Sequence, residues 1–242
     1  MNITYAKFTD SGDRDYNEDS LFVKEMQGAY CFIVADGLGG HGKGEVASQL
    51  VCETVAQVMA ESGEAQNIPM MFEVAQERLL QKQIEEHATN AMKTTMNIVT
   101  VDDKQVNWGH VGDTRTYYFK KNKLISYTKD HSVPQMMVSM GEIKEKDIRH
   151  HEDRNRLLRV MGVEWDKPLY VVEDPISIDK KQAFLMCTDG FWEYIEEKQM
   201  VKCLKKSSTP QEWLDKMVEI VKKNGADYDM DNFTATVFWI NC

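Results

Sequence analysis

The sequence predicts an α+β fold in which antiparallel sheets carry pairs of helices on their outer faces. Stretches with the composition of β-strands come in clusters along the chain, and the helical stretches stand in pairs between them. Short turns at Asp102-Asp103 and Lys121-Asn122 join neighbouring strands, as in hairpins. The chain has neither a GxGxxG fingerprint in the required register nor a GK[ST] phosphate loop, so a doubly wound nucleotide-binding sheet is disfavoured.

Each element follows from the period of its apolar residues. A strand is expected where apolar and polar residues alternate, as in NITYAKFT, or where a short apolar run stands between turns, as in AYCFIVAD. A helix is expected where apolar residues recur every three or four positions. Strands are therefore predicted at 2–9, 19–26, 29–36, 96–102, 105–113, 115–121, 123–129, 169–178, 182–189 and 233–240. Helices are predicted at 45–62, 69–86, 196–206 and 210–223, with short helical pieces at 133–140 and 144–149.

The composition is typical of a soluble globular protein. Of 242 residues, 42% are hydrophobic and 28% are charged, and the formal net charge is −10. This charge argues against a generic binder of nucleic acid or anionic membranes, because phosphate groups select basic surfaces. No apolar run approaches the roughly 18 residues of a membrane span, and the N-terminus lacks the apolar core of a signal peptide. We therefore expect a cytoplasmic protein that contacts neither nucleic acid nor membrane.

No feature of the sequence divides the chain. It has no internal repeat, low-complexity tract or Pro/Ser-rich linker, so residues 1–242 are expected to form one domain. The five cysteines, at positions 31, 52, 187, 203 and 242, are odd in number and form no CxxC pair. They are interpreted as reduced, mostly buried thiols, which disfavours a disulfide framework and a zinc site.

A glycine-rich segment directly after a predicted strand is the first candidate functional motif. Residues 34–45 read VADGLGGHGKGE, with five glycines around Asp36. Strand, glycine-rich turn and helix in this order usually suggest a phosphate cradle, but an acid at the strand end repels an anion. A metal ion held by Asp36 resolves the conflict, because the ion would then hold the phosphate. Gly37 would let the backbone pass close to that ion and could lend its carbonyl as a ligand.

Acids beside apolar strands recur along the chain. They are Asp113 after WGHVG, Asp189 after AFLMCT, Asp231 before FTATVFWI, and Glu18 and Asp19 before LFVKEM. Carboxylates at strand ends on one edge of a sheet would converge on a single cleft, where they repel one another unless a cation lies among them. Oxygen ligands alone suit Mg²⁺ or Mn²⁺ better than zinc. Arg14 precedes Glu18 and Asp19 in the sequence, and its guanidinium is suited to bidentate phosphate binding.

Seven segments carry a resemblance to a known family. They are RDYNED, DGLGGHGKGEVAS, VGDTRTYYF, TKDHS, LLRVMG, CTDGFWE and DNFTATV. In order and spacing they resemble the motifs of the Mg²⁺/Mn²⁺-dependent serine/threonine protein phosphatases of type 2C, and the Gly39-Gly40 pair and the short length look like the bacterial branch. The match spans Tyr5 to Trp239. It implies a four-layer α–β–β–α sandwich of two antiparallel sheets flanked by helix pairs, with a variable flap at about 130–165.

The resemblance also implies the metal ligands. Asp36 would bridge two ions, with the Gly37 carbonyl on one of them, and Asp189 and Asp231 would complete the shell of the first ion. Glu18 and Asp19 would hold the second ion, largely through waters. Asp113 would bind a third ion, as in bacterial members, and would share it with Asp189.

Three further residues receive roles from the resemblance. Arg14 would clamp the phosphate, and Asn232 would orient the site without binding a metal. Glu193 stands where many relatives have aspartate, so the affinity for the third ion is expected to differ.

The implied reaction is hydrolysis of phosphoserine or phosphothreonine by direct attack of a water activated between two Mn²⁺ or Mg²⁺ ions, without a phosphoenzyme. Some family members have a histidine two residues after the bridging aspartate, where this chain has Leu38. Metal-bound water is therefore expected to protonate the leaving group. His41, in the glycine-rich turn, is interpreted as a bystander.

The expected substrate is a phosphoprotein of bacterial signalling, phosphorylated by a serine/threonine kinase, and the chain is expected to act as a monomer. Two alternatives stay open. A catalytically silent, metal-binding signalling module would keep the ligands without turnover, although the intact Asp36, Asp189 and Asp231 argue against it. A phosphatase that acts on a phosphorylated anti-sigma antagonist would keep the chemistry and change the substrate.

Overall fold

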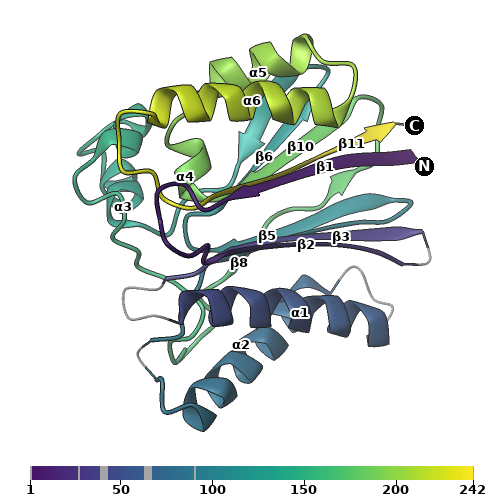
Figure 1. The fold of residues 1–242 in the computed structure, drawn as a ribbon. Coiled ribbons are helices and arrows are strands. Elements are labelled where there is room, and N and C mark those ends of the chain that lie inside the picture. Colours follow the sequence, from purple (N-terminus) through teal and green to yellow (C-terminus); the bar gives the residue numbers. More distant parts are fainter. Residues whose placement is uncertain (1, 27, 39–42, 63–66, 90, 242) are drawn as a thin grey trace.

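Two antiparallel sheets packed face to face form the centre of the molecule (Figure 1). The computed structural model describes residues 2–26, 28–38, 43–62, 67–89 and 91–241. Sheet A has the order β1-β11-β10-β6-β7, formed by β1 (Asn2–Asp10), β11 (Phe233–Asn241), β10 (Gln182–Cys187), β6 (Arg115–Lys120) and β7 (Lys123–Tyr127). Sheet B has the order β2-β3-β4-β5-β8, with β9 also on β5, formed by β2 (Asp19–Met26), β3 (Ala29–Asp36), β4 (Met96–Val101), β5 (Gln105–Val111), β8 (Val171–Val172) and β9 (Ile176–Ser177).

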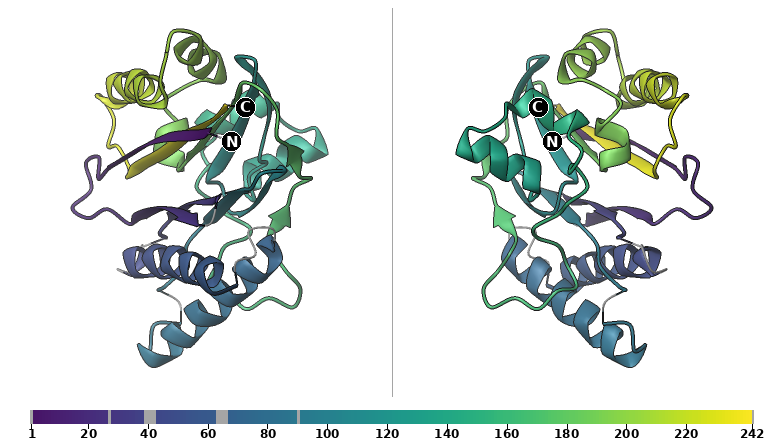
Figure 2. Two further views of the ribbon diagram at one scale, coloured as in Figure 1. Left: turned by 90° about the vertical axis from the view of Figure 1, so that its right-hand side faces the viewer. Right: turned by 90° about the vertical axis from the view of Figure 1, so that its left-hand side faces the viewer.

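A pair of helices covers the outer face of each sheet (Figure 2). Sheet B carries α1 (Gly44–Ser62) and α2 (Ile68–Glu85), and sheet A carries α5 (Glu197–Lys205) and α6 (Pro210–Gly225). Three short helices lie near one end of the sandwich: α3 (Val133–Met140), the 3₁₀ helix η1 (Glu145–His150) and α4 (Asp189–Trp192). The predicted α–β–β–α sandwich of the α+β class is therefore confirmed.

Three apolar clusters hold these layers together. The cluster between the sheets is built around Phe238, whose ring stacks on Phe32 at 4.1 Å and on Phe184 at 4.7 Å between centroids. A second cluster lies under α1 and α2, and a third under α5 and α6. Strands β4 and β10 have no exposed residue, because a sheet covers one face and helices cover the other. This explains why both read as continuous apolar or small-residue runs rather than as alternating patterns.

Several predicted strands have other bounds in the structure, and three of them show a physical reason. The predicted strand 105–113 ends at Val111, because Gly112 has a φ of +100°, which an extended strand does not allow. The predicted strand 169–178 is reduced to β8 and β9, two residues each, on either side of Pro175, which has no N–H for a ladder. The predicted strand 182–189 ends at Cys187, and Asp189 begins α4, a helix that the sequence analysis missed.

The two ends of the sandwich are formed by different parts of the chain. Asn2 pairs with Asn241 at one end, so the two chain ends lie side by side (Figure 1). Asp10 pairs with Phe233 at the other end, where the loop 11–18, α4 and the predicted flap 130–165 are found. The candidate functional residues therefore lie away from the paired chain ends.

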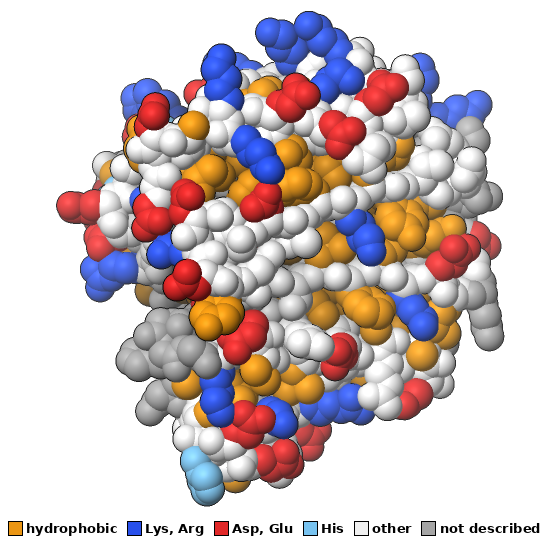
Figure 3. Space-filling view, viewed as in Figure 1, with side chains coloured by type: hydrophobic (Ala, Val, Ile, Leu, Met, Phe, Trp, Pro, Cys, Tyr) orange, Lys and Arg blue, Asp and Glu red, His pale blue; other side chains and the backbone are white. Residues whose placement is uncertain are grey.

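The described residues also show how surface charges, thiols and apolar helices are distributed. Acidic and basic side chains are mixed over the face drawn in Figure 3. Cys31, Cys52, Cys187 and Cys203 are buried free thiols, and Cys242 lies outside the described residues. Within the described ranges, no helix combines the length and the apolar character needed to cross a bilayer.

Candidate metal centre

An acidic cleft of about 730 Å³ opens at the flap end of the sandwich. Its lining residues come from both sheets and from the flap: Arg14, Asp15, Tyr16, Glu18, Asp36, Gly37, Leu38, Asp113, Asn155, Leu157, Asp189, Asp231 and Asn232. Among these described residues, six are acids and one is an arginine. The cleft therefore concentrates negative charge that its own side chains do not balance.

Four aspartates of the cleft come from four different places in the chain. Asp36 is the last residue of β3, and Asp113 lies in the turn between β5 and β6. Asp189 begins α4, and Asp231 stands two residues before β11. The expectation that they share one edge of a single sheet is wrong, because β3 and β5 belong to sheet B whereas β10 and β11 belong to sheet A. They meet because both sheets end at the same side of the sandwich.

Burial and mutual repulsion raise the pKa of these carboxyls. Burial is the main cause of the raised pKa of Asp36, and the charges of Asp19, Asp189, Asp113 and Asp231 add to it. Burial and then Asp189 raise the pKa of Asp113, while burial and then Asp231 raise the pKa of Asp189 to about 6. The folded chain thus disfavours the charged form of its own acids, which is the condition that a bound cation would relieve.

Gly37 is the point where three segments of backbone meet. A Cβ atom placed on it would lie 2.4 Å from the Gly44 carbonyl oxygen and 2.6 Å from the Glu18 carbonyl oxygen. Its N–H donates to the Glu18 carbonyl at 3.1 Å, which joins the start of β2 to the end of β3. Any side chain here would separate Glu18 from Asp36, so the glycine keeps both acids at one cleft. The glycines at 39, 40 and 42, and His41, lie outside the described residues.

Arg14 is the only basic residue among the described lining residues, and it already has partners. Its Nε and Nη2 donate to the two carboxylate oxygens of Asp231 at 3.2 and 3.3 Å, and Nη1 lies 3.8 Å from Asp229. The charge of Asp231 is the main cause of the raised pKa of Arg14. The guanidinium is therefore held at the cleft by the same acid that is expected to bind a metal ion.

Asn232 fastens the loop 11–18 to the start of β11. Its Oδ1 accepts a hydrogen bond from the Glu18 N–H at 2.7 Å. Its Nδ2 donates to the carbonyl oxygens of Ser11 and Tyr16, both at 2.9 Å. The amide thus fixes the loop that carries Arg14 and Glu18, and it does so with both of its polar atoms.

Two of the expected site residues lie beside the cleft rather than in its lining. Asp19 accepts a hydrogen bond from the Thr188 hydroxyl at 2.9 Å, and burial raises the pKa of Asp19 to about 8. Glu193 forms an ion pair with Arg154 of the flap at 2.9 Å, and burial is the main cause of its raised pKa. Asp19 therefore joins β2 to the residue before Asp189, and Glu193 joins α4 to the flap.

The donor set fits a hard divalent cation, although the acids are not yet arranged around one. Among the residues that the structure describes, no three Asp, Glu, His or Cys side chains form a ready-made metal site. Asp231 is turned to Arg14 and Asp19 to Thr188, whereas no described residue donates a hydrogen bond to the Asp36 carboxylate. A buried carboxylate without a donor, beside other acids and a backbone carbonyl, is the chemistry of an Mg²⁺ or Mn²⁺ site.

Four lining residues were missed by the sequence analysis: Asp15, Tyr16, Asn155 and Leu157. Tyr16 stands in the RDYNED motif, so its neighbours Arg14 and Glu18 were a usable signal. Asn155 and Leu157 belong to the flap, and Leu157 is placed by a β-bridge to Ser132. Nothing in the local sequence distinguishes them, because their position depends on that long-range pairing.

The fold and the cleft together define an α–β–β–α sandwich with an acidic cleft at one end. The chain belongs to the protein phosphatase 2C family, whose family model matches residues 11–234. The chain is accordingly a serine/threonine protein phosphatase of this family. The resemblance read from the seven motifs is confirmed.

Relatives and solved structures agree with this assignment. The serine/threonine phosphatase stp of Listeria monocytogenes serotype 4b (strain F2365) is 32% identical over 241 residues, covering 95% of this chain and 93% of that protein. The structure of serine/threonine phosphatase Stp1 from Staphylococcus aureus superimposes with a TM-score of 0.86 at 25% identity and covers 100% of this chain and 96% of that one. The catalytic domain of PstP in complex with two manganese ions gives a TM-score of 0.83 at 23% identity, with 99% of each chain covered.

Proposed function

We propose that this chain hydrolyses phosphoserine and phosphothreonine in proteins with the help of two Mn²⁺ or Mg²⁺ ions bound in the acidic cleft. One observation carries the proposal: six acids and a single, already paired arginine line the described part of the cleft. Such a concentration of negative charge is relieved by divalent cations and not by a phosphate alone. The relative that is described with two manganese ions has the same fold.

The ligands are assigned from the positions of the acids. Asp36 would contact both ions, because its carboxylate has no donor among the described residues and faces the charges of acids from both sheets. Asp189 and Asp231 would hold one ion from the sheet A side, together with the Gly37 carbonyl. Glu18 and Asp19 would hold the second ion from the start of β2, largely through waters. Asp113 would share a third ion with Asp189, whose charge is the largest cause after burial of the raised pKa of Asp113.

Divalent ions in this position would lower the pKa of water towards neutrality and screen the charge of a phosphoryl group. The chain itself supplies the geometry. Gly37 and Asn232 keep the β3 end, the loop 11–18 and the β11 start in contact, so the acids converge without being able to move apart. None of the four described cysteines lines the cleft, and all four are buried, so a cysteine nucleophile is not part of the proposal.

Arg14 is the proposed phosphate clamp. Its guanidinium lies at the cleft and is held by the Asp231 carboxylate at 3.2 and 3.3 Å. When Asp231 turns to a cation, the fork of donors becomes available for two phosphate oxygens. Glu193 and Asn232 act without touching phosphate, Glu193 through its ion pair to the flap and Asn232 through the loop 11–18.

We further propose a setting for the enzyme. The substrate is a phosphoprotein made by a serine/threonine kinase in bacterial signalling, and the chain works in the cytoplasm as a monomeric single domain with residues 130–165 as a flap over the cleft. The names of the relatives, serine/threonine phosphatases of bacteria, support the substrate class. The ion pair between Arg154 and Glu193 supports a flap that packs beside the site.

The test is phosphate release from a phosphothreonine peptide across a Mn²⁺ titration, with EDTA as the stop. Release that requires the ion, disappears with EDTA and returns with added Mn²⁺ is the expected result. A folded protein that binds Mn²⁺ but releases no phosphate would instead be the silent signalling module. Comparison of several phosphoproteins, an anti-sigma antagonist among them, then decides whether the substrate range is broad or narrow.

A further inference from the structure

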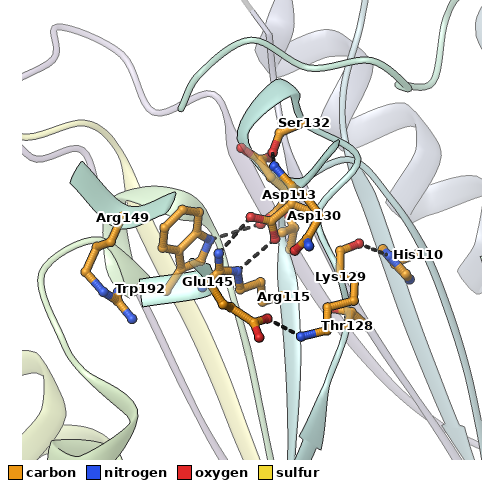
Figure 4. A network of polar contacts seen from close by, with 12 residues as sticks. His110, Asp113, Arg115, Thr128, Lys129, Asp130, Ser132, Glu145, Arg149 and Trp192 are labelled. Carbon is orange, nitrogen blue, oxygen red and sulfur yellow. Dashed lines mark hydrogen bonds and ion pairs between the residues drawn. The ribbon is translucent and has the colours of Figure 1, made fainter. Parts of the chain in front are cut away.

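A second group of buried charges lies next to Asp113, one of the acids that line the cleft (Figure 4). Arg115 of β6 and Asp130, at the start of the flap, are both nearly inaccessible to solvent. The Arg115 Nε and Nη2 donate to the two Asp130 oxygens at 2.8 and 2.7 Å. A bidentate pair of this kind is rigid, because both groups are planar and all four atoms are engaged.

Trp192 connects this pair to the cleft. Its ring lies 3.6 Å from the Arg115 guanidinium carbon, measured to the ring centroid, and only 1% of the residue is exposed. Its indole Nε1 donates a hydrogen bond to the backbone carbonyl oxygen of Asp113 at 2.9 Å. The indole is therefore fixed by a charged pair on one side and fixes a cleft acid on the other.

Trp192 also shares a helix with a second cleft acid. It is the last residue of α4, whose first residue is Asp189, and its N–H donates to the Thr188 carbonyl at 3.2 Å. A shift of this single helical turn would therefore carry the indole with it. Asp113 lies between β5 of sheet B and β6 of sheet A, and Asp189 follows β10 of sheet A. The Trp192 indole contacts the first of these segments, and its backbone belongs to the second.

The flap holds the same indole from outside. The Arg149 guanidinium of η1 lies 5.7 Å from the Trp192 ring centroid and forms an ion pair with Glu197 at 2.7 Å. At the base of the flap, the His131 N–H donates to the Gly112 carbonyl, next to Asp113. Arg149 of the flap therefore lies against Trp192, and His131 of the flap binds the backbone next to Asp113.

Trp213 shows what an ordinary core tryptophan looks like in this protein. It belongs to the same apolar cluster as Trp192, is fully buried, and donates its indole N–H to a backbone carbonyl, that of Met200, at 3.1 Å. Met200 is in α5 and does not line the cleft. Both tryptophans are buried, and both donate an indole hydrogen bond to a backbone carbonyl. The carbonyl belongs to Asp113 for Trp192 and to Met200 for Trp213.

We propose that Trp192 is a positioning residue of the metal centre, which sets the relative position of Asp113 and Asp189 through its indole hydrogen bond and its place on α4. The inference rests on the proposed function, because it assigns a support to two of the proposed ligands. Changes to groups that orient metal ligands typically weaken metal binding about 10- to 100-fold. Trp192 acts through the backbone of a ligand residue, so the lower end of this range applies.

The test compares Trp192→Phe with Trp213→Phe by calorimetric titration of metal-free protein with Mn²⁺. Both variants lose the same indole N–H and the same ring volume from one cluster. Trp192→Phe should bind the most weakly held Mn²⁺ about tenfold less tightly, whereas Trp213→Phe should titrate like the wild type. Equal titration curves for the two variants would make Trp192 a core residue only and overturn the inference. A wild-type protein that binds no Mn²⁺ would overturn the proposed function together with it.

A second measurement covers the case in which Trp192→Phe does not fold. Wild-type protein labelled with 5-fluorotryptophan has five ¹⁹F resonances, one for each tryptophan. Phe variants of the other four tryptophans assign them, and the fifth belongs to Trp192. Titration with diamagnetic Mg²⁺ should shift the Trp192 resonance and leave that of Trp213 in place. A Trp192 resonance that does not respond to the ion would overturn the positioning role.

Discussion

Two groups of buried charges lie side by side in this phosphatase, and they differ in how their charge is balanced. Arg115 and Asp130 neutralise each other with two short hydrogen bonds, and the Trp192 ring covers the guanidinium. In the cleft, burial and neighbouring acids raise the pKa values of Asp36, Asp113 and Asp189, and the one arginine among the described lining residues is bound to Asp231.

The comparison separates charges that serve the fold from charges that await a ligand. A buried ion pair is costly to break, since removal of one partner leaves the other uncompensated. A group of like charges behaves in the opposite way, because removal of one member relieves the others. Equivalent substitutions in the two groups should therefore have opposite effects on stability.

The largest effect is expected from Asp36→Asn. Turnover of a phosphothreonine peptide should fall by more than about 100-fold, because loss of a metal ligand exceeds the loss of a group that only orients one. The midpoint of thermal unfolding in EDTA should stay the same or rise, since one buried charge leaves the cluster. Asp15→Asn, in the same lining but exposed, is the control and should keep its turnover. Asp36→Asn protein that retains turnover would remove Asp36 from the site.

Asp130→Asn should have the opposite effect on stability. The free energy of unfolding should decrease by about 3–5 kcal/mol, measured by urea denaturation, because Arg115 stays buried without its counter-charge. Asp153→Asn breaks the exposed pair with Arg156, at 3.1 Å, and should cost at most about 1 kcal/mol. If both substitutions cost the same, the buried pair contributes no more than a surface pair and the comparison fails.

Arg14→Ala should act on substrate binding. KM should rise about 10- to 100-fold with a smaller change in kcat, because charge-assisted hydrogen bonds to phosphate are lost while the ligands stay. Arg78→Ala is a suitable control, since Arg78 is on α2 and hydrogen-bonds to Gln57 of α1. Steady-state kinetics at saturating Mn²⁺ measures both constants. Arg14→Ala with unchanged KM and kcat would show that the guanidinium does not contact phosphate.

The smallest expected effect is the pH dependence of the stability of the metal-free protein. The pKa of Asp189 is raised from 3.8 to about 6 and that of Asp19 from 3.8 to about 8. The folded state therefore binds more protons than the unfolded state between about pH 4 and pH 8. Stability from these groups is fully present below about pH 4 and is lost as the pH rises through 6 and 8. Melting temperatures in EDTA should fall with pH relative to those in Mn²⁺, and a constant difference would contradict the raised pKa values.

Much of the fold could be predicted because local patterns decide it. The strands 19–26 and 29–36 and the helix 133–140 have the predicted bounds, since the period of their apolar residues marks them. The acids beside the strands could be found for the same reason, because each follows or precedes an apolar run. Local pattern also failed where one residue overrides its neighbours, as Pro175 and Gly112 do at β8, β9 and β5.

The rest of the site depends on contacts between distant segments. That Asp36 and Asp231 meet across two sheets follows from the sheet order, which no single stretch encodes. Asn155 and Leu157 reach the cleft because the flap returns to His131, whose carbonyl accepts from the Leu158 N–H at 2.7 Å. The Arg14 pairing joins residues 217 positions apart. Such pairings are visible only after the chain has folded.

The pairing of β1 with β11 has a consequence for the order of events during synthesis. Strands β2 to β5 and helices α1 and α2 lie between residues 19 and 111, so much of sheet B can form while the ribosome is still active. Sheet A cannot be completed at that stage, because β11 lies between β1 and β10 and is the last of the strands of this sheet in the sequence. Until then β1 has no neighbour in its sheet, and Asp231 is missing from the cleft. A nascent chain therefore has no finished acidic centre, and it acquires one only when its final strand closes the sandwich.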